Sequence, residues 1–254
     1  MSSYESGVGS HRPWPAPSRP WLMAQRWHDL LFAHWPVPIE PIRALIPSAL
    51  TLDLYDGMAW LAVTPFRMSG VRPRFFPALP WVSEFPELNV RTYVTLAGNK
   101  PGVFFFSLDA GNPLAVEVAR RAFHLPYYRA EMRVTPAGNG DARTIHYTSR
   151  RTHEGAPSAE LSGSYAPAGP VFRSRPGSLD SFLTERYCLY AVDSVSHIYR
   201  AEIDHPQWPL QPANARFDVN TMTAQIGITL PDASPLLHFS RYLEVVVWLP
   251  ERVV

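Results

Sequence analysis

The sequence predicts a mainly β fold in which an antiparallel sheet closes into a barrel or a sandwich, with a few short helices outside it. About ten segments alternate apolar and polar residues over strand lengths, and turns rich in Gly, Asn and Pro separate them. Only two or three segments show helical spacing. With 254 residues, of which 46% are apolar, the chain has enough material for one large core.

The clearest local unit lies between residues 86 and 132. Residues 89–96 alternate, so Asn89, Arg91 and Tyr93 share one strand face, and we expect that face to point into the barrel. The opposite face is expected to pack against helices. A turn at residues 98–102 leads to a second strand at 103–108, which predicts a hairpin. Pro113 then opens a helix that runs to Phe123.

Before this unit, the chain predicts a strand at residues 27–35 with His28 and His34 on one face, and a short helix at residues 41–46. Asp56-Gly57 predicts a hairpin between residues 51–54 and 58–68. Residues 70–86 contain four prolines and read as a long loop. We expect Phe75, Phe76 and Trp81 to anchor this loop over one mouth of the barrel.

After the central unit, three alternating runs near residues 129–134, 142–149 and 159–165 predict a meander. Ser178 is expected to cap a helix that reaches about Tyr187. The last strands are expected near residues 196–203, 221–230 and 240–249, with a Pro-rich loop around residues 206–212. Because no shift in composition divides the chain, we expect a disordered lead-in at residues 1–20 and a single domain at residues 21–254.

The composition narrows the range of partners. A net charge of +1 argues against nucleic-acid binding, and no apolar run approaches the roughly 20 residues that span a bilayer. Cys188 is the only cysteine, which favours the cytoplasm and excludes an internal disulfide. We therefore expect a small-molecule ligand, an anionic one, and neither nucleic acid nor membrane as a partner. The oligomeric state stays open, with a homo-oligomer among the alternatives.

Several segments carry a resemblance to a known family. Residues 41–53 resemble the helix-then-strand opening of the acetoacetate decarboxylase superfamily, and residues 112–125 resemble the helix before its catalytic lysines. A closer resemblance, over most of residues 27–249, is to the YqjF-like branch, whose function is unknown. Its marks here are FAHWPV at 32–37, DGMAW at 56–60, PFRM at 65–68, NVRTYV at 89–94, FFSLDA at 105–110 and ERY at 185–187. The resemblance implies a cone-like barrel with outer helices and a small-molecule cavity.

The resemblance does not carry over the decarboxylase chemistry. That enzyme forms a Schiff base on one of two adjacent lysines, and those lysines align near Tyr127-Tyr128, which cannot form an imine. Its arginine aligns near His28, and its two carboxylates align near Trp60 and Phe75. Lys100 is the only lysine, and its place in a Gly-Asn-Lys-Pro-Gly turn predicts a solvated amine. We therefore expect neither a Schiff base nor a cofactor.

Arg91 is the leading candidate for a site residue. A guanidinium in the middle of a strand that faces a barrel interior must be paired, because burying a lone charge is costly. It could bind a carboxylate or phosphate ligand, or it could form a structural ion pair with Glu87, Asp109 or Glu117. The residues alone leave these alternatives open.

The other predicted site residues surround Arg91. The predicted catalytic residues are Arg91, Tyr93, His28, Tyr127 and Tyr128, and the predicted binding residues are Asn89, Glu185, Arg186, Phe106 and Trp60. Tyr127 and Tyr128 should point to opposite sheet faces, so at most one of them faces the cavity. The histidine spacings fit no metal site, and neither a nucleophile elbow nor a glycine-rich phosphate loop is present.

Two functional classes fit these observations. One is an enzyme that acts on a small oxo- or acyl-carboxylate by acid/base catalysis without a Schiff-base lysine. The other is a non-catalytic protein that keeps the ligand cavity. Arg91, Tyr93 and His28 in one cavity would favour the enzyme, whereas a cavity lined only by Phe, Trp and Leu would favour the binding protein.

Overall fold

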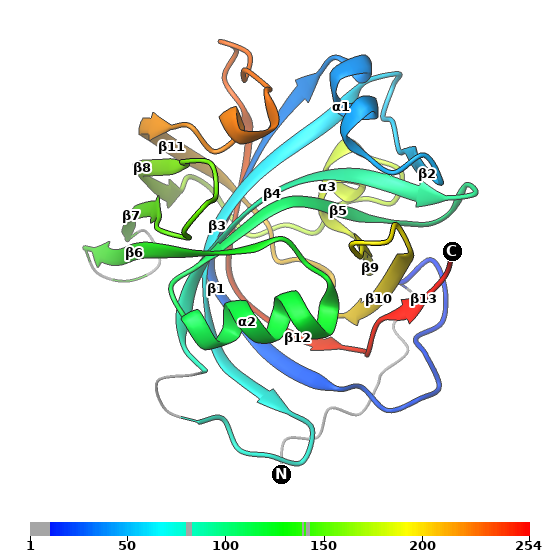
Figure 1. Ribbon diagram of the computed structural model, residues 1–254. Coiled ribbons are helices and arrows are strands. Elements are labelled where there is room, and N and C mark those ends of the chain that lie inside the picture. Colours follow the sequence, from blue (N-terminus) through cyan, green and yellow to red (C-terminus); the bar gives the residue numbers. More distant parts are fainter. Residues whose placement is uncertain (1–10, 80–82, 139, 141–142) are drawn as a thin grey trace.

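The computed structural model describes residues 11–79, 83–138, 140 and 143–254, and it is a mainly β barrel with three short helices in this part of the chain (Figure 1). The helices are α1 (Ile39–Leu45), α2 (Pro113–Phe123) and α3 (Leu179–Thr184), with one 3-10 turn, η2 (Ala224–Ile226). The strands are β1 (Met23–Val37), β2 (Leu50–Leu52), β3 (Ala59–Pro73), β4 (Phe85–Leu96), β5 (Asn99–Ala110), β6 (Tyr127–Ala137), β7 (Thr144–Arg151), β8 (Glu160–Pro167), β9 (Cys188–Val192), β10 (Ile198–Asp204), β11 (Gln211–Asn220), β12 (Leu236–Val247) and β13 (Glu251–Arg252).

The strand pairings among these described residues close two rings. Nine strands form the larger ring, in the order β5, β6, β7, β8, β11, β12, β1, β3 and β4, with β4 returning to β5. Seven strands form the smaller ring, in the order β12, β10, β9, β5, β4, β3 and β1. The rings share β1, β3, β4, β5 and β12. The closed, mainly antiparallel barrel that the sequence predicts is therefore confirmed, although β5 pairs in parallel with β6 and β9.

Sharing strands explains the burial pattern. The middles of β1, β3 and β4 are buried on both faces, because each face lines the interior of one ring. Leu31, Val63 and Val90 belong to the core of the nine-strand ring, whereas Leu30 and Phe66 belong to the core of the seven-strand ring. The β4 face with Val90 thus packs mainly into a second barrel core, and not against helices as the alternation alone suggested.

The helices lie on the outside of the barrel. Asn112 caps α2, its Oδ1 accepting hydrogen bonds from the backbone N–H groups of Leu114 and Ala115 at 3.0 and 3.1 Å, and Pro113 opens the helix as predicted. In Figure 1, α2 lies across the front of the lower half of the barrel. Ser178 caps α3, as predicted, but the helix ends at Thr184, short of Tyr187.

Two predicted pairings differ from the structure. Asp56-Gly57 does turn the chain, with both residues at positive φ, but only Tyr55 and Met58 pair across this turn. The strand before the turn, β2, pairs with β4 and not with β3. Residues 221–230, expected as a strand, form a turn and η2. The strand in this part of the chain is β11 at Gln211–Asn220, the first residues of which were expected to be loop.

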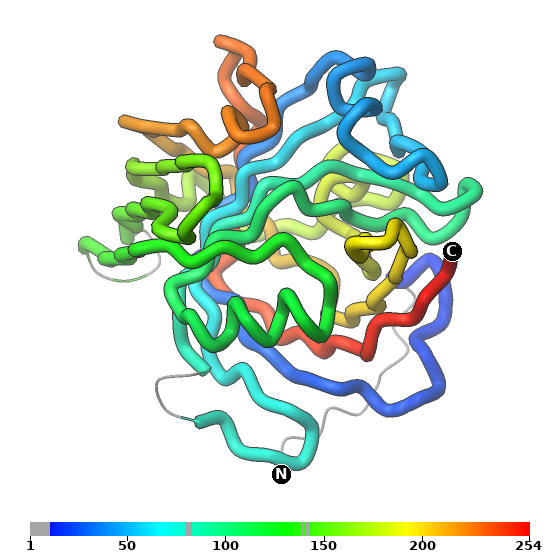
Figure 2. Tube along the Cα trace, viewed as in Figure 1, coloured from blue at the N-terminus to red at the C-terminus, as the bar shows by residue number. Residues whose placement is uncertain are grey.

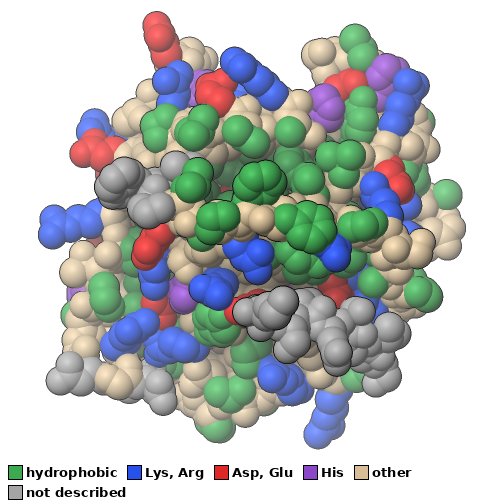
Figure 3. Space-filling model, turned by 90° about the horizontal axis from the view of Figure 1, so that it is seen from below, with side chains coloured by type: hydrophobic (Ala, Val, Ile, Leu, Met, Phe, Trp, Pro, Cys, Tyr) green, Lys and Arg blue, Asp and Glu red, His purple; other side chains and the backbone are tan. Residues whose placement is uncertain are grey.

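The loop predicted at residues 70–86 is shorter, because β3 continues to Pro73 and β4 begins at Phe85. Phe75 and Phe76 do not anchor it: their side chains are 88% and 65% exposed. Trp81, the third expected anchor, lies outside the described residues. Figure 3 views the molecule from the end where this loop lies and shows hydrophobic side chains at the surface, with basic side chains among them.

The predicted lead-in is only partly described, since residues 1–10 lie outside the described ranges. Residues 11–20 lie against the barrel, beside the C-terminal strand (Figure 2). The Trp248 indole N–H donates to the Arg19 carbonyl at 2.7 Å, and Arg12 donates to the carboxylate of Asp204 at 2.9 Å. This segment therefore packs on β10 and on the end of β12.

Candidate functional site

A cavity of about 190 Å³ lies inside the seven-strand ring, under α2. One face of β4 supplies its polar wall, because Phe85, Glu87, Asn89 and Arg91 alternate toward it. A single water needs about 10–15 Å³ in such a space, so the cavity is large enough for a small organic molecule. This is the face that the sequence predicts to point into the barrel.

The remaining walls are mostly apolar. They come from the six other strands of this ring, from α2 and the residues after it, and from the segment after β10. These residues are Met23, Trp27, Leu30, Phe66, Met68, Val71, Val103, Phe105, Leu108, Ala115, Val118, Ala119, Phe123, Leu125, Leu189, Ile203, Trp208 and Val247. Charges inside such a wall interact strongly, because little water screens them.

Arg91 is buried without a carboxylate. Its side chain is 8% exposed, its Cζ lies 5.2 Å from the centre of the Phe32 ring, and its Nε has no hydrogen-bond partner among the described residues. The described ion pairs give it no partner within 4.0 Å. Leaving a buried guanidinium in this state is costly, and a bound anion would relieve it.

The three carboxylates considered as structural partners of Arg91 are all engaged elsewhere. Glu87 accepts a hydrogen bond from Tyr127, Asp109 pairs with Arg151, and Glu117 pairs with Arg121. The structural ion pair left open by the sequence is therefore wrong for each of these candidates.

Arg186 brings a second guanidinium to the same end of the cavity. Its Nη1 donates to Asp53 at 2.5 Å, its Nη2 has no partner in the described structure, and its Cζ lies 4.9 Å from the centre of the Tyr93 ring. Burial lowers the pKa of Arg186, and the nearby Asp53 opposes that change. Burial likewise raises the pKa of Tyr93, while both Arg91 and Arg186 oppose the rise. Both cations thus lie close to Tyr93.

Glu87 and Tyr127 form the other polar group of the cavity. The Tyr127 hydroxyl donates to Glu87 Oε2 at 2.6 Å, and the Glu87 side chain is almost fully buried. Burial raises the pKa of Glu87 to about 7, although its hydrogen bonds with Tyr127 and Asn89 act in the opposite direction. A carboxyl group with this pKa can both donate and accept a proton near neutral pH. Burial raises the pKa of Tyr127 well above 10.

Tyr93 and Tyr127 differ in whether they reach the cavity. The Tyr93 hydroxyl donates to the Leu183 carbonyl at 2.9 Å and lies 2.8 Å from His34 Nε2, so it is held in the core beside the cavity. Tyr127 reaches the cavity itself. Tyr128 points to the opposite face, where its ring packs 4.1 Å from Arg151 Cζ. The expected opposition of the two tyrosines is present, and Tyr127 is the one that faces the ligand space.

His28 does not enter the cavity. In the β1–β3 ladder, His28 pairs with Arg67 and Ala33 pairs with Val63, so β1 has one more residue than β3 between these two pairs. Asp29, in this bulge, has a φ of 49°. This bulge reverses the alternation, so Trp27 and Leu30 face the cavity and His28 bonds Ser69 Oγ at 2.7 Å outside it. The prediction that His28 and His34 share a face is wrong for this reason.

A second bulge displaces Phe106. In the β4–β5 ladder, Val90 pairs with Ser107 and Arg91 pairs with Phe105, so Phe106 has no opposite residue. Phe105 lines the cavity in its place, and Phe106 packs on the core of the nine-strand ring.

Trp60 and Glu185 also lie outside the cavity wall. Trp60 packs with Tyr93 and Leu183 in a small cluster behind it. Glu185 accepts hydrogen bonds from the Tyr187 hydroxyl at 2.5 Å and from the Trp208 backbone at 3.0 Å, which is a structural role. Of the predicted binding residues, the structure brings Asn89 and Arg186 to the cavity, together with Arg91 and Tyr127 of the predicted catalytic set.

Four polar residues of the cavity were not predicted as site residues: Gln25, Glu87, Thr184 and His205. Glu87 could have been found, because it shares the alternation of Asn89 and Arg91. His205 follows β10 and carries no local signal. Its ring is buried, stacks on Tyr187 at 4.6 Å between ring centres, and has a pKa lowered by burial.

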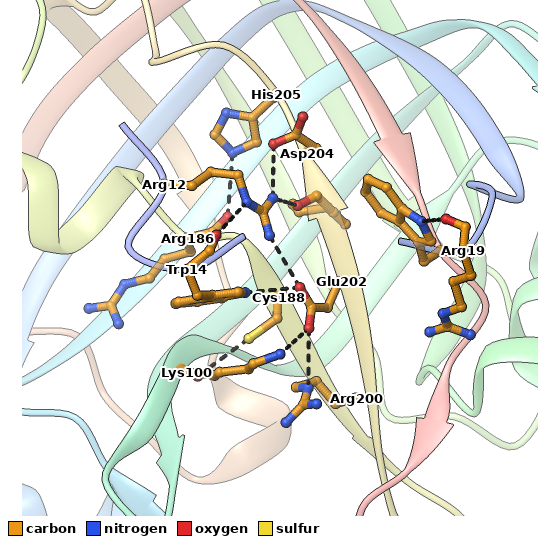
Figure 4. A network of polar contacts seen from close by, with 12 residues as sticks. Arg12, Trp14, Arg19, Lys100, Arg186, Cys188, Arg200, Glu202, Asp204 and His205 are labelled. Carbon is orange, nitrogen blue, oxygen red and sulfur yellow. Dashed lines mark hydrogen bonds and ion pairs between the residues drawn. The ribbon is translucent and has the colours of Figure 1, made fainter. Parts of the chain in front are cut away.

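Figure 4 shows the polar network beside this end of the barrel. Glu202 receives the Trp14 indole N–H at 2.9 Å and pairs with Arg12 at 3.2 Å and with Lys100. Lys100 is therefore ion-paired, not simply solvated as the turn suggested, and it is absent from the described cavity wall. Within the described residues, no group of three His, Cys, Asp or Glu side chains could hold a metal ion. In the same residues, no helix is both long and apolar enough to cross a bilayer.

Comparison with solved structures identifies the architecture. The chain resembles the enduracididine biosynthesis enzyme MppR complexed with pyruvate, with a TM-score of 0.61 at 10% identity over 97% of this chain and 94% of that one. It also resembles acetoacetate decarboxylase from Legionella pneumophila, with a TM-score of 0.60 at 11% identity over 100% and 98% of the two chains. At these identities the likeness establishes a shared fold.

Comparison of sequences identifies the family. The family DUF2071, described as an uncharacterized conserved protein (COG2071), matches residues 24–244. The uncharacterized protein YqjF of Bacillus subtilis (strain 168) is 47% identical over 228 residues, which are 90% of this chain and 91% of that protein. Since both matches cover most of the barrel, the chain belongs to the DUF2071 family, as a relative of YqjF, and it shares the fold of acetoacetate decarboxylase.

Proposed function

We propose that this protein is an enzyme that binds a small oxo- or acyl-carboxylate in the cavity of the seven-strand ring and acts on it by acid/base catalysis. The observation that carries the proposal is Arg91, a buried guanidinium with no described carboxylate partner, which faces a largely apolar cavity. A ligand carboxylate would supply the missing counter-charge. Pyruvate bound to MppR, a protein of the same fold, supports a ligand of this class.

Glu87 and Tyr127 supply the chemistry. As a carboxylate, Glu87 removes a proton from the carbon next to the substrate carbonyl, and the C–H electron pair moves onto the carbonyl oxygen to give an enolate. Once Glu87 is protonated, its carboxyl group no longer carries the negative charge that attracts the Tyr127 hydroxyl. That hydroxyl then donates its hydrogen bond to the enolate oxygen. Return of the proton completes the cycle without a cofactor or a co-reactant.

No Schiff base takes part in this proposal. The side chain of the only lysine, Lys100, is ion-paired with Glu202 away from the described cavity wall. Borohydride reduction in the presence of acetoacetate should leave the intact mass of the protein unchanged. A stable adduct on Lys100 would contradict this part of the proposal.

Solvent exchange tests the function. In D₂O with levulinate or a longer methyl-ketone acid, the parent should speed the loss of the proton NMR signal next to the ketone. Glu87→Gln should abolish the enzyme-dependent exchange. Arg91→Met should require a higher ligand concentration to reach the same exchange rate. Arg216→Met is the matched control. The Arg216 side chain is 83% exposed, pairs with Asp218 and is not part of the described cavity wall.

The alternative is a binding protein without catalysis, which the predominance of apolar wall residues favours. In that case, carboxylates would raise the melting temperature of the parent but not that of Arg91→Met, and no exchange would occur. If Arg91→Met only destabilised the fold and kept the ligand-induced shift, Arg91 would be part of the scaffold.

A further inference from the structure

We infer that the ligand of this cavity is an elongated, mostly apolar monocarboxylate that carries a ketone or hydroxyl group several carbons from its carboxylate. This inference rests on the proposed function and specifies its substrate class. It follows from two polar groups at opposite ends of one strand face, with Asn89 between them and apolar side chains on the neighbouring strands.

The two polar groups are far apart along β4. Glu87 and Arg91 are four residues apart, which is about 13 Å at roughly 3.3 Å per residue. Arg91 turns toward Phe32 and Tyr93, where Arg186 also lies. Glu87 is instead bonded to Tyr127, at the start of β6. The cationic end and the carboxyl end therefore serve different parts of a ligand.

The space between the two ends is suited to a hydrocarbon segment. Only Asn89 separates Glu87 and Arg91 on the cavity face of β4. Apolar side chains of β1, β3 and β5, including Leu30, Phe66 and Phe105, line the same cavity. Each methylene group buried there should tighten binding about fourfold, which is the hydrophobic gain expected for one CH₂.

A compact oxo acid such as pyruvate cannot use both ends at once. With its carboxylate at Arg91, it would leave the Glu87–Tyr127 pair without a ligand partner and the apolar walls unfilled. A longer ketone acid would meet both groups. Because burial raises the pKa of Glu87 to about 7, its carboxyl group can donate to a ketone oxygen or accept from a hydroxyl.

Calorimetric titration with a chain-length series tests this inference. The ligands are pyruvate, acetoacetate, levulinate and longer methyl-ketone acids with further methylene groups, beside fatty acids of equal length without the ketone. We expect affinity for the parent to rise about fourfold per methylene to an optimum and then fall. At the optimum, the ketone should improve binding about tenfold over the plain fatty acid.

Variants assign the two ends. Glu87→Gln and Tyr127→Phe should remove most of the advantage of the ketone and leave the fatty acid series unchanged, and either variant suffices if the other fails to fold. Arg91→Met should weaken the whole series, whereas Arg216→Met should not. Tightest binding of pyruvate, or equal binding of ketone and fatty acids, would overturn the inference alone. Failure of every carboxylate to bind the parent would overturn the proposed function as well.

Discussion

Among single residues, Glu87 gives the cavity its acid, because its buried carboxyl group accepts a hydrogen bond from Tyr127 and burial raises its pKa to about 7. Alternation placed Asn89 and Arg91 on the inner face of β4, and both line the cavity. Glu87 has the same alternation, but it was considered only as a counter-ion for Arg91. What sets its chemistry is burial and the hydroxyl of Tyr127, 40 positions away in the sequence. Such a contact leaves no local pattern, so neither the role of Glu87 nor its pKa could be predicted.

The raised pKa of Glu87 makes stability depend on pH. The pKa is about 7 in the folded protein and 4.5 in the unfolded chain, so the folded state holds more protons between these values. Stability should therefore fall as the pH rises from about 4.5 to about 7, by on the order of 3 kcal/mol from this group. Glu87→Gln should lack this component.

Urea unfolding of the parent and of Glu87→Gln at pH 5, 6, 7 and 8 measures the difference. The stability of the parent relative to the variant should decline steadily across the series. A difference that stays constant with pH would show that Glu87 titrates normally.

At the scale of elements, bulges decided which predicted residues reach the site. The sequence predicted β1, β4, β5 and α2 close to their positions, because alternation, turn residues and the Asn112-Pro113 helix start are local signals. A bulge inserts one residue without disturbing the apolar composition, so it cannot be recognised from alternation. The bulges at Asp29 and Phe106 therefore misplaced His28 and Phe106. The Asp56-Gly57 turn was recognised, but its predicted pairing was wrong because β2 finds its partner in β4.

The β1 bulge depends on Asp29. This residue has positive φ, is 4% exposed, and accepts from Arg143 at 2.8 Å and from Arg241 at 2.5 Å. Asp29→Ala would place a strained backbone on a residue that rarely adopts it and remove the charge that pairs both arginines. We expect a loss of about 3–5 kcal/mol. Asp29→Asn, which tolerates the backbone but lacks the charge, should lose less.

Chemical denaturation of both variants provides the measurement. Equal unfolding midpoints for Asp29→Ala and Asp29→Asn would mean that backbone conformation contributes nothing to the cost. A midpoint for Asp29→Ala equal to that of the parent would contradict the structural role of this residue altogether.

In the molecule as a whole, the nine-strand ring encloses a packed core, and the seven-strand ring encloses the cavity. The sequence predicts a shared strand such as β4 as alternating, but long-range pairings enclose both of its faces, one in each ring. Pairing of β5 with β9 and of β10 with β12 joins segments more than 40 positions apart. The barrel class was therefore predictable from alternation and from the family resemblance, whereas the location of the cavity in the smaller ring was not.

This division predicts that two buried arginines respond differently to substitution. Arg151 belongs to the larger ring and pairs with Asp109 at 2.6 Å, with both side chains almost fully buried. Arg151→Met leaves Asp109 without its counter-charge, and such a loss costs about 3–5 kcal/mol. Replacing both residues, as in Asp109→Asn with Arg151→Met, should restore part of the stability, because no buried charge then remains unpaired.

Arg91 should behave in the opposite way. It has no described carboxylate partner, so Arg91→Met should keep or raise the melting temperature of the free protein and abolish the shift caused by carboxylates. A folded Arg151 variant, or the double variant in its place, should retain that shift. Thermal unfolding of all three proteins with and without ligand makes the comparison. A loss of the shift in the Arg151 variants equal to that in Arg91→Met would mean that the larger ring also shapes the site, and that the two rings do not act separately.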